Sequence, residues 1–405
     1  MKIAVITSGF LPVPATKGGA VENLIVNLLN ENEKHKNFNS HVYSVYEEKA
    51  INESKKYEEA EFEFIKPNIF VKILDKITFW IAKNILKKEN CQSYRYIFQR
   101  LYFLNKISKD LKKNNYDKVL LENHPTQYLA LKWRKNYLKY KDRYYYHCHN
   151  EFKDTYKCKE IIENTNKIIC VSQYIANTMA TYLNMDKNKF VVLKNGIDSK
   201  RFNLNINDVE KNKLKEKYNI GKEDKILLFV GRVVPEKGVK ELINSLEYIK
   251  TENVKILVLG AALNALKIKT NYQLEIEELS EKFKGKVMFT GFVNYGDIYK
   301  FYKLADIAVF PSIWDDPAPL TIIEALTSGL PIITTNSGGI PEYATNGSAV
   351  ILERDEKLVK NLAKAIDNLL NNKEKLKEME QKCILVSKEL NLKNYYNNFL
   401  KVLEE

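Results

Sequence analysis

The sequence predicts two α/β domains in series, each built on a doubly wound parallel sheet. Short apolar runs alternate with amphipathic stretches along most of the 405 residues, and this alternation of strand and helix is typical of parallel sheets. The apolar runs are nearly continuous, as expected for strands that helices cover on both faces. A chain of this length is too long for one ordinary core and suits two domains.

The second half shows the alternation most clearly. Strands are expected at residues 225–230, 254–259, 286–290, 307–310, 331–335 and 349–352. Amphipathic stretches at residues 239–249, 274–283 and 296–303 separate several of these strands, and their periodicity predicts helices that pack on the sheet.

The first half follows the same order. Strands are expected at residues 3–7, 41–44, 118–122, 144–148, 167–171 and 190–193, and residues 68–115 are helical in composition. Each half opens with a strand, a glycine-bearing loop and a helix, so the carboxyl ends of the strands would face a central cleft. We expect an N-terminal domain at 1–203, a C-terminal domain at 204–385 and a C-terminal helix at 386–405 that packs back on the first domain. The polar stretch at 203–224 is the expected linker.

Composition bears on the compartment and the partners. The net charge is +13, and residues 66–113 hold twelve lysines and arginines against three acids. The chain has neither a secretory signal pattern nor an apolar run of about 20 residues, and its five scattered cysteines suit a reducing compartment. We therefore expect a cytoplasmic protein whose cysteines are mostly buried apolar groups.

The most specific segment covers residues 311–325. A strand is expected to end at Phe310, and Pro319 is typical of a helix start. The first N–H groups of a helix are unpaired and attract anions. Since proline has no N–H, only Ala318, Leu320 and Thr321 can donate here.

Two carboxylates lie in this segment. Asp316 can accept hydrogen bonds from sugar hydroxyls, and Glu324 can bind a vicinal diol such as a ribose. An isolated pair of acids usually means surface charge or helix capping. The flanking prolines, the preceding strand and the following pair of glycines favour a binding site.

These residues resemble the glutamate-x7-glutamate signature of retaining glycosyltransferases of family 4, which have the GT-B fold of two Rossmann-like domains facing a central cleft. Glu324 matches the second glutamate, and Asp316 replaces the first with a shorter acid. Residues 18–22, 195–198, 231–237 and 338–342 resemble further segments of the family in the same order. The resemblance therefore covers nearly the whole chain.

The resemblance implies transfer of a hexose-type sugar from a nucleotide-diphosphate sugar to a saccharide acceptor, with retained anomeric configuration. It places the acceptor on the N-terminal domain, the donor on the C-terminal domain, and the activity in cell-surface polysaccharide synthesis. It implies no metal and no other cofactor. The implied catalytic residues are His149, Asp316, Arg232 and Lys237. The implied donor-binding residues are Gly18, Gly19, Val293, Ala318, Leu320, Thr321 and Glu324.

The two cations also have a physical rationale. Negative charge grows on the leaving diphosphate as the glycosidic bond breaks, so cations fixed there stabilise the transition state more than the ground state. Arg232 supplies a planar fork of donors and Lys237 a point charge. The chain contains no Asp-x-Asp triplet, which agrees with a metal-independent reaction.

Histidines mark the ends of two strands in the first half. His147 and His149 would lie on one face of their strand, but a metal site needs a third ligand, and the only nearby candidate is His124. We expect no metal and a structural role for His147, whereas His149 matches the family histidine that faces the donor sugar. His124 either contacts the acceptor or serves only its loop.

Other classes of protein would carry different motifs in this sequence. A nicotinamide dehydrogenase would need G-x-G-x-x-G directly after a strand, and the loop at residues 8–19 does not have this spacing. A nucleic-acid-binding protein would explain the positive charge, but the chain has no recognised binding motif of that class. A sugar-nucleotide epimerase or glycan phosphorylase of the same fold stays open, since a fold does not fix a reaction.

The basic segment at 68–115 has two interpretations. Its cations alternate with apolar and aromatic residues, which suits either an anionic membrane surface that carries a lipid-linked acceptor or a solvated face over a core. Both interpretations stay open. The donor sugar and nucleotide, the acceptor, the linkage and the oligomeric state are not determined by the sequence.

Overall fold

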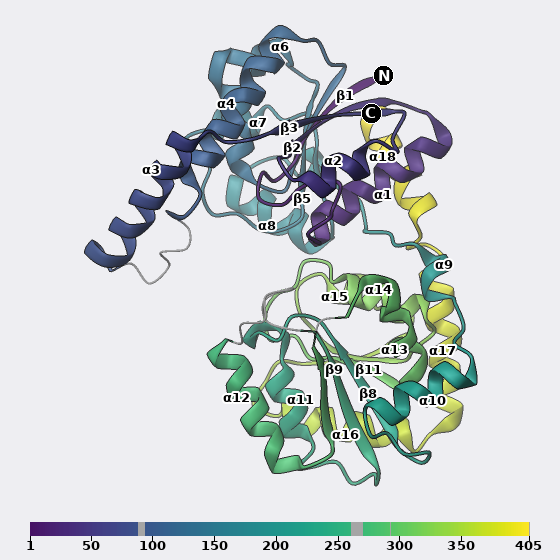
Figure 1. The fold of residues 1–405 in the computed structure, drawn as a ribbon. Coiled ribbons are helices and arrows are strands. Elements are labelled where there is room, and N and C mark those ends of the chain that lie inside the picture. The colour runs from purple at the N-terminus through teal and green to yellow at the C-terminus, as the bar shows by residue number, and fades with distance from the viewer. Residues whose placement is uncertain (88–93, 261–269, 292, 405) are drawn as a thin grey trace. The chain divides into compact units, whose positions relative to one another are not determined.

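A computed structural model describes residues 1–87, 94–260, 270–291 and 293–404. It confirms the predicted class, because the chain forms two compact units that each hold a parallel sheet with helices packed around it (Figure 1). The first unit comprises Met1–Lys194 and Tyr395–Glu405, and the second comprises Asn195–Asn394. The polar stretch expected as a linker contains helix α10 (Asp208–Lys217) of the second unit.

The first unit has seven parallel strands in the order β3-β2-β1-β4-β5-β6-β7. They are β1 (Lys2–Ile6), β2 (Asn39–Val45), β3 (Ala60–Ile65), β4 (Lys118–Glu122), β5 (Tyr144–Cys148), β6 (Ile168–Cys170) and β7 (Phe190–Val192). All six predicted strands are present. Strand β3 was not predicted, because this edge strand alternates apolar residues with Glu61 and Glu63 instead of forming a continuous apolar run.

Helices and turns connect these strands. They are α1 (Ala20–His35), α2 (Glu48–Ser54), α3 (Ile69–Trp80), the π-helical turn η1 (Ile81–Ile85), α4 (Ile97–Lys113), η3 (Pro125–Gln127), α5 (Tyr128–Lys132), η4 (Trp133–Lys135), α6 (Asn136–Lys139), α7 (Lys159–Glu163), α8 (Gln173–Leu183) and η5 (Lys187–Lys189). The helical prediction for the basic segment is therefore confirmed by α3, η1 and α4. Lys88 and Cys91 lie outside the described residues, and the other four cysteines are free and buried.

The second unit has six parallel strands in the order β10-β9-β8-β11-β12-β13. They are β8 (Lys225–Val230), β9 (Val254–Leu259), β10 (Val287–Gly291), β11 (Ile307–Phe310), β12 (Ile332–Thr335) and β13 (Ala349–Leu352), as predicted. The helices are α9 (Ser199–Phe202), α10, α11 (Val239–Ser245), α12 (Asn271–Ser280), α13 (Ile298–Leu304), α14 (Leu320–Thr327), α15 (Ile340–Tyr343), α16 (Leu358–Leu370) and α17 (Lys373–Ser387), with single turns η6 (Pro235–Lys237), η7 (Glu281–Phe283) and η8 (Tyr295–Asp297).

Apolar clusters cover both faces of this second sheet. Phe301 of α13 and Ile322 of α14 belong to one cluster, and Leu242 of α11 and Leu362 of α16 belong to the other. Burial on both faces explains why the strands read as continuous apolar runs. Strand order reverses between β8 and β11, and between β1 and β4 in the first unit. Ligands of such sheets bind at these points of reversal, outside the carboxyl ends of the strands.

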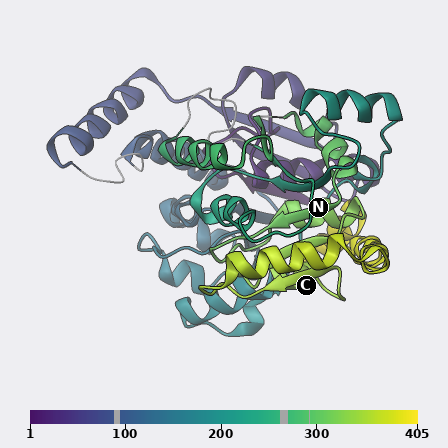
Figure 2. The same cartoon turned by 90° about the horizontal axis from the view of Figure 1, so that it is seen from below.

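Two helices have unusual positions. Helix α18 (Leu392–Glu404) begins in the second unit and ends in the first, where the Tyr396 hydroxyl contacts Asn32 Oδ1 at 2.8 Å. Helix α3 extends away from the rest of its unit in both views (Figures 1 and 2). Among the described residues, no helix combines the length and apolar character that crossing a membrane requires.

Candidate active site

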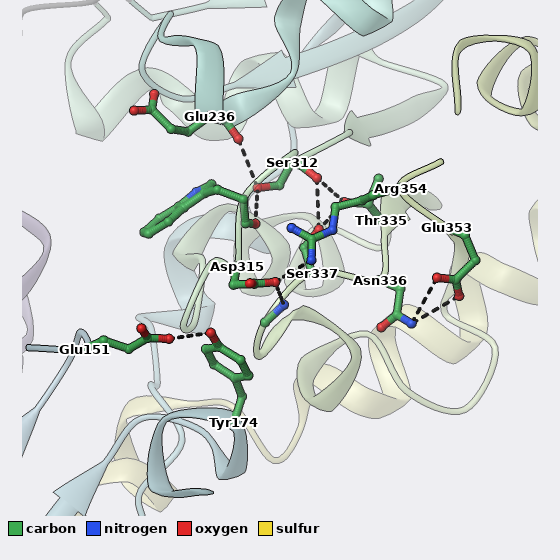
Figure 3. Close-up of polar contacts among 12 residues, drawn as sticks. Glu151, Tyr174, Glu236, Ser312, Asp315, Thr335, Asn336, Ser337, Glu353 and Arg354 are labelled. Atoms are coloured by element: carbon green, nitrogen blue, oxygen red, sulfur yellow. Dashed lines mark hydrogen bonds and ion pairs between the residues drawn. The ribbon is translucent and has the colours of Figure 1, made fainter. Parts of the chain in front are cut away.

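A tightly bonded loop follows β11 in the second unit. The carbonyl oxygen of Ser312 accepts hydrogen bonds from Thr335 Oγ1 at 2.6 Å and Ser337 Oγ at 2.9 Å, and Ser312 Oγ donates to the Glu236 carbonyl at 3.2 Å (Figure 3). These bonds join the loop to the end of β12, to Ser337 just after it, and to turn η6. The loop therefore has a fixed conformation at the carboxyl ends of β8, β11 and β12.

Lys237 and Asp316 form an ion pair at this point. Asp316 is buried, and Lys237 lies in turn η6. Gly238, with φ 73°, makes the approach possible, since a Cβ there would lie 1.8 Å from the Pro311 carbonyl oxygen. The structure thus brings together two of the predicted catalytic residues. Arg232 is exposed on the same loop after β8.

The loop after β12 closes against Asp315 and Asp316. The Gly339 N–H donates to the Asp316 carbonyl at 2.8 Å, and a Cβ on Gly338 would lie 2.6 Å from that oxygen. Arg354 donates to Asp315 Oδ1 at 2.6 Å (Figure 3). Glycine at position 338 is therefore required for this close packing.

Helix α14 carries three of the predicted donor-binding residues, Leu320, Thr321 and Glu324. It begins at Leu320, and Pro319 supplies no side-chain cap among the described residues, so the N–H groups at Leu320 and Thr321 start the helix without one. Half-buried Ala318 precedes it. Half-buried Val293 packs against the apolar cluster under this helix.

Glu324 is buried inside α14. The Tyr302 hydroxyl donates to its Oε2 at 2.8 Å. Burial raises the pKa of Glu324 to about 7, since a carboxylate loses its hydration there. The group therefore changes charge near neutral pH.

A buried triad lies at the carboxyl ends of β4 and β5 in the first unit. Glu122 Oε2 lies 3.2 Å from His147 Nδ1 and 3.1 Å from His149 Nε2. Burial opposes ionisation of Glu122, but the two imidazoles outweigh it and lower the pKa of Glu122 to about 2. Burial and the neighbouring His147 lower the pKa of His149 to about 4. His149 is therefore neutral at physiological pH, and Glu122 is a carboxylate.

The triad corrects one part of the sequence analysis. The third group beside the two histidines is Glu122, which pairs in register with His147 on the neighbouring strand, and not His124. Its oxygen and the two nitrogens lie close enough to one another to hold a metal ion, as do groups of His41, Glu63 and Asp110. His147 is only partly satisfied, because its Nε2 is buried without a partner in the described part of the chain.

Gly18 and Gly19 lie in the loop between β1 and α1. Both have positive φ, and a Cβ on Gly19 would lie 2.1 Å from Glu22 Oε2. Glu22 in turn accepts from Ser8 Oγ at 2.8 Å. These contacts explain structurally why residue 19 is a glycine. The role of Gly18 and Gly19 in donor binding stays a prediction.

His124 caps turn η3. Its Nδ1 lies 2.9 Å from Thr126 Oγ1. Burial and the nearby Arg100 lower the pKa of His124 to about 3. His124 is therefore neutral at physiological pH, and its Nδ1 can accept a hydrogen bond.

Three residues of these sites were not predicted from the sequence: Glu122, Tyr302 and Arg100. Glu122 left a signal, namely one acid at the end of an otherwise apolar strand. Tyr302 is one of 25 tyrosines and Arg100 one of twelve cations in the basic segment, so neither stands out.

Comparison with known proteins gives two family matches that together span most of the chain. Residues 77–201 match the family described as "Glycosyltransferase Family 4", and residues 210–386 match "Glycosyl transferases group 1". The first match lies in the first unit except for residues 195–201, and the second match lies in the second unit.

Individual proteins agree with these matches. Spore coat protein SA of Bacillus subtilis is 26% identical, over 93% of this chain and 91% of its own. The capsular polysaccharide biosynthesis glycosyltransferase CapM of Staphylococcus aureus is 31% identical, over 58% of this chain and 63% of its own. The structure of Anabaena HepE with UDP and glucose superimposes with a TM-score of 0.75 at 16% identity, covering 100% of this chain and 99% of HepE.

Proposed function

We propose, since the chain belongs to the family 4 glycosyltransferases of the GT-B fold, that it transfers a hexose-type sugar from a nucleotide-diphosphate sugar to a saccharide acceptor with retention of configuration. This reaction would serve polysaccharide synthesis, as the printed name of CapM says of that relative. The observation that carries this proposal is the Lys237–Asp316 pair directly before α14, whose buried Glu324 ends the signature segment. HepE, whose structure contains UDP and glucose, supports a UDP-linked hexose as the donor.

Each residue has a proposed task. Lys237, Arg232 and the first N–H groups of α14 neutralise the diphosphate as it leaves, which is the charge that grows in the transition state. Asp316 accepts hydrogen bonds from the sugar, and Glu324 accepts them from the ribose. Neutral His149, held by Glu122, hydrogen-bonds a hydroxyl of the donor sugar and so orients the anomeric carbon.

We further propose that the reaction needs no metal. Two cations and a helix N-terminus already provide positive charge for the diphosphate, and the chain has no Asp-x-Asp triplet.

The test combines product structure with chelation. NMR coupling constants of the new linkage, made from an α-linked donor, are expected to show an α-linkage, and the rate is expected to be unchanged in EDTA. A β-linked product would exclude retention. Loss of activity in EDTA that manganese restores would exclude the metal-free mechanism.

The acceptor proposal comes from α3 and η1. Most of their large apolar residues are exposed, with Phe70 at 74% and Trp80 at 57%, which supports the membrane interpretation over a core for this part of the segment. The exposed apolar residues of this surface, which we call the α3 surface, are Ile69, Phe70, Ile73, Leu74, Ile77, Trp80, Ile81, Ile85 and Leu86.

Charge on the α3 surface has a single sign. Lys72, Lys76, Lys83 and Lys87 are exposed, whereas the acid of this segment, Asp75, is buried and accepts from the N–H groups of Phe98 at 2.8 Å and Gln99 at 3.0 Å. A helix that exposes apolar residues beside cations suits an anionic lipid surface. We propose that the α3 surface binds the inner face of a membrane and that the saccharide acceptor is lipid-linked.

A further inference from the structure

A cavity lies in the first unit at the carboxyl ends of β1, β2 and β3. Its volume is about 570 Å³, within the range of small-molecule sites. Four cations line it: Lys17 from the loop after β1, Lys66 after β3, Lys72 from α3 and Arg100 from α4. The carboxylate in the lining is Glu47. The cavity therefore has a net positive lining.

Arg100 is the buried cation of this cavity. It is 9% exposed, and both of its terminal nitrogens are buried without a hydrogen-bond partner in the described part of the chain. Its Nε donates to Thr126 Oγ1, and its Cζ lies 4.0 Å from the centroid of the Phe10 ring. Burial lowers the pKa of Arg100 to about 10, so the guanidinium is still charged at neutral pH. A buried charge with unpaired donors is unfavourable unless an anion meets it.

The neighbours do not supply that anion. Glu47 accepts from Thr16 Oγ1 at 2.7 Å and from the Ala50 N–H at 2.8 Å, so its carboxylate caps α2. His124, which lies beyond Thr126, is neutral at physiological pH. Within the described residues, Arg100 forms no ion pair with a carboxylate.

We propose that this cavity binds a phosphate or diphosphate group of the acceptor, with Arg100 as the central ligand and Lys66 and Lys72 supplying further charge. That the ligand is the acceptor rests on the proposed function. The planar guanidinium matches the oxygens of a phosphate in a bidentate arrangement. Phe10, Tyr46 and Tyr96 also line the cavity and provide ring faces for the adjoining sugar or lipid.

The cavity continues toward the α3 surface. A second hollow of about 520 Å³ runs along α3, and Lys72, Tyr96 and Gln99 line both. Phe79 and Trp80 line the second hollow. This continuity favours a lipid-linked diphosphate over a soluble sugar phosphate, with the lipid along α3 and the diphosphate at Arg100.

The first test measures anion binding without catalysis. It uses the full chain with Arg232→Ala and Lys237→Ala, so that the proposed donor site does not bind the probe, and inorganic pyrophosphate as the ligand. Pyrophosphate is expected to raise the Tm of this protein but not that of the same protein with Arg100→Met. Lys109→Met, which removes an exposed cation from the same helix outside the cavity, is expected to keep the full shift. No shift, or an equal shift with Arg100→Met, would overturn the proposal.

The parent and the Arg100→Met variant both carry Arg232→Ala and Lys237→Ala, so any loss of stability from those two changes is common to both. Arg100→Met removes a buried, unpaired charge, so its Tm without ligand is expected to equal or exceed that of the parent. If the pyrophosphate-induced shift needs Arg100 but the wild-type enzyme glycosylates no acceptor, the result would support the anion site and reject the proposed function.

The second test distinguishes the sources of the phosphate in the otherwise unchanged enzyme. Arg100→Met is expected to raise KM at least tenfold for a diphosphate-linked saccharide, and to change KM less than twofold for the same saccharide without phosphate and for the donor. Binding to phosphatidylglycerol vesicles is expected to be unchanged. Loss of vesicle binding with an unchanged KM would place the phosphate in a lipid headgroup and overturn the acceptor assignment.

Discussion

Lys237 forms an ion pair with buried Asp316, and in the proposed mechanism it also neutralises the leaving diphosphate. We expect Lys237→Ala to lower kcat by two or more orders of magnitude, since removing one electrostatic group from a transition state costs about 3 kcal/mol. Lys240→Ala, which removes an exposed cation three residues away, is the matched control and should change kcat little.

This prediction needs a folding check. Lys237→Ala leaves the buried Asp316 carboxylate unpaired, which destabilises the fold by itself. The double variant with Asp316→Asn removes that charge. If the double variant regains wild-type kcat, Lys237 serves the fold and not the reaction.

Glu324 is expected to make donor binding depend on pH. Its pKa is raised to about 7 by burial, so the folded protein binds a proton there between pH 4.5 and 7 that the unfolded chain releases. The stability contributed by this group is therefore present at low pH and is lost as pH rises through 7.

Donor affinity is expected to change in the opposite direction. A ribose diol donates to the ionised carboxylate, so calorimetric affinity for the nucleotide should rise between pH 6 and 8. Glu324→Gln should bind weakly at both pH values without this rise. Near-normal affinity in Glu324→Gln would show that Glu324 does not bind the ribose.

At the scale of elements, α3 exposes apolar side chains of a kind that are usually buried in a protein core. Wild-type protein is expected to sediment with vesicles that contain phosphatidylglycerol, and less as salt is raised, because each cation contributes about 1 kcal/mol near an anionic surface. Reversing Lys83 and Lys87 to Glu should abolish sedimentation, and Phe70→Ser with Trp80→Ser should weaken it.

A matched reversal tests whether the effect belongs to α3. Lys373→Glu with Lys377→Glu changes the net charge equally on exposed positions of α17 and should leave sedimentation unchanged. If both pairs act alike, general electrostatic attraction explains the binding. If wild-type protein stays in the supernatant at low salt, a soluble acceptor is the better proposal.

At the scale of the molecule, the first unit needs both ends of the chain. Tyr395, Tyr396, Phe399, Val402 and Leu403 of α18 are buried, and burying such a side chain stabilises by roughly 1.5–3 kcal/mol. Truncation after residue 391 should therefore lower the Tm of the first unit while the second keeps its transition in calorimetry. Removing only the last two residues should change neither transition.

Local signals made much of the protein predictable. Apolar runs predicted twelve of the thirteen strands in the described part of the chain, because strands buried on both faces need them. The start of α14 followed from Pro319, and the place of Lys237 and Asp316 followed from the strands before them, since parallel strands present their carboxyl ends together. Strand β3 was missed because an edge strand need not be apolar throughout.

The sequence by itself determined the fold class, the signature segment and the residues that follow each strand, because these depend on neighbours along the chain. Tertiary structure alone decided that Glu122 contacts both His147 and His149 and that Tyr302 meets Glu324. It also decided that Arg100 is buried without a counter-ion among the described residues, while Lys72, Lys76 and Lys83 of its segment are exposed. Burial and pairing depend on residues more than 20 positions apart in each case. The role of a charged side chain depends on its burial and its partners, and the tertiary fold determines both.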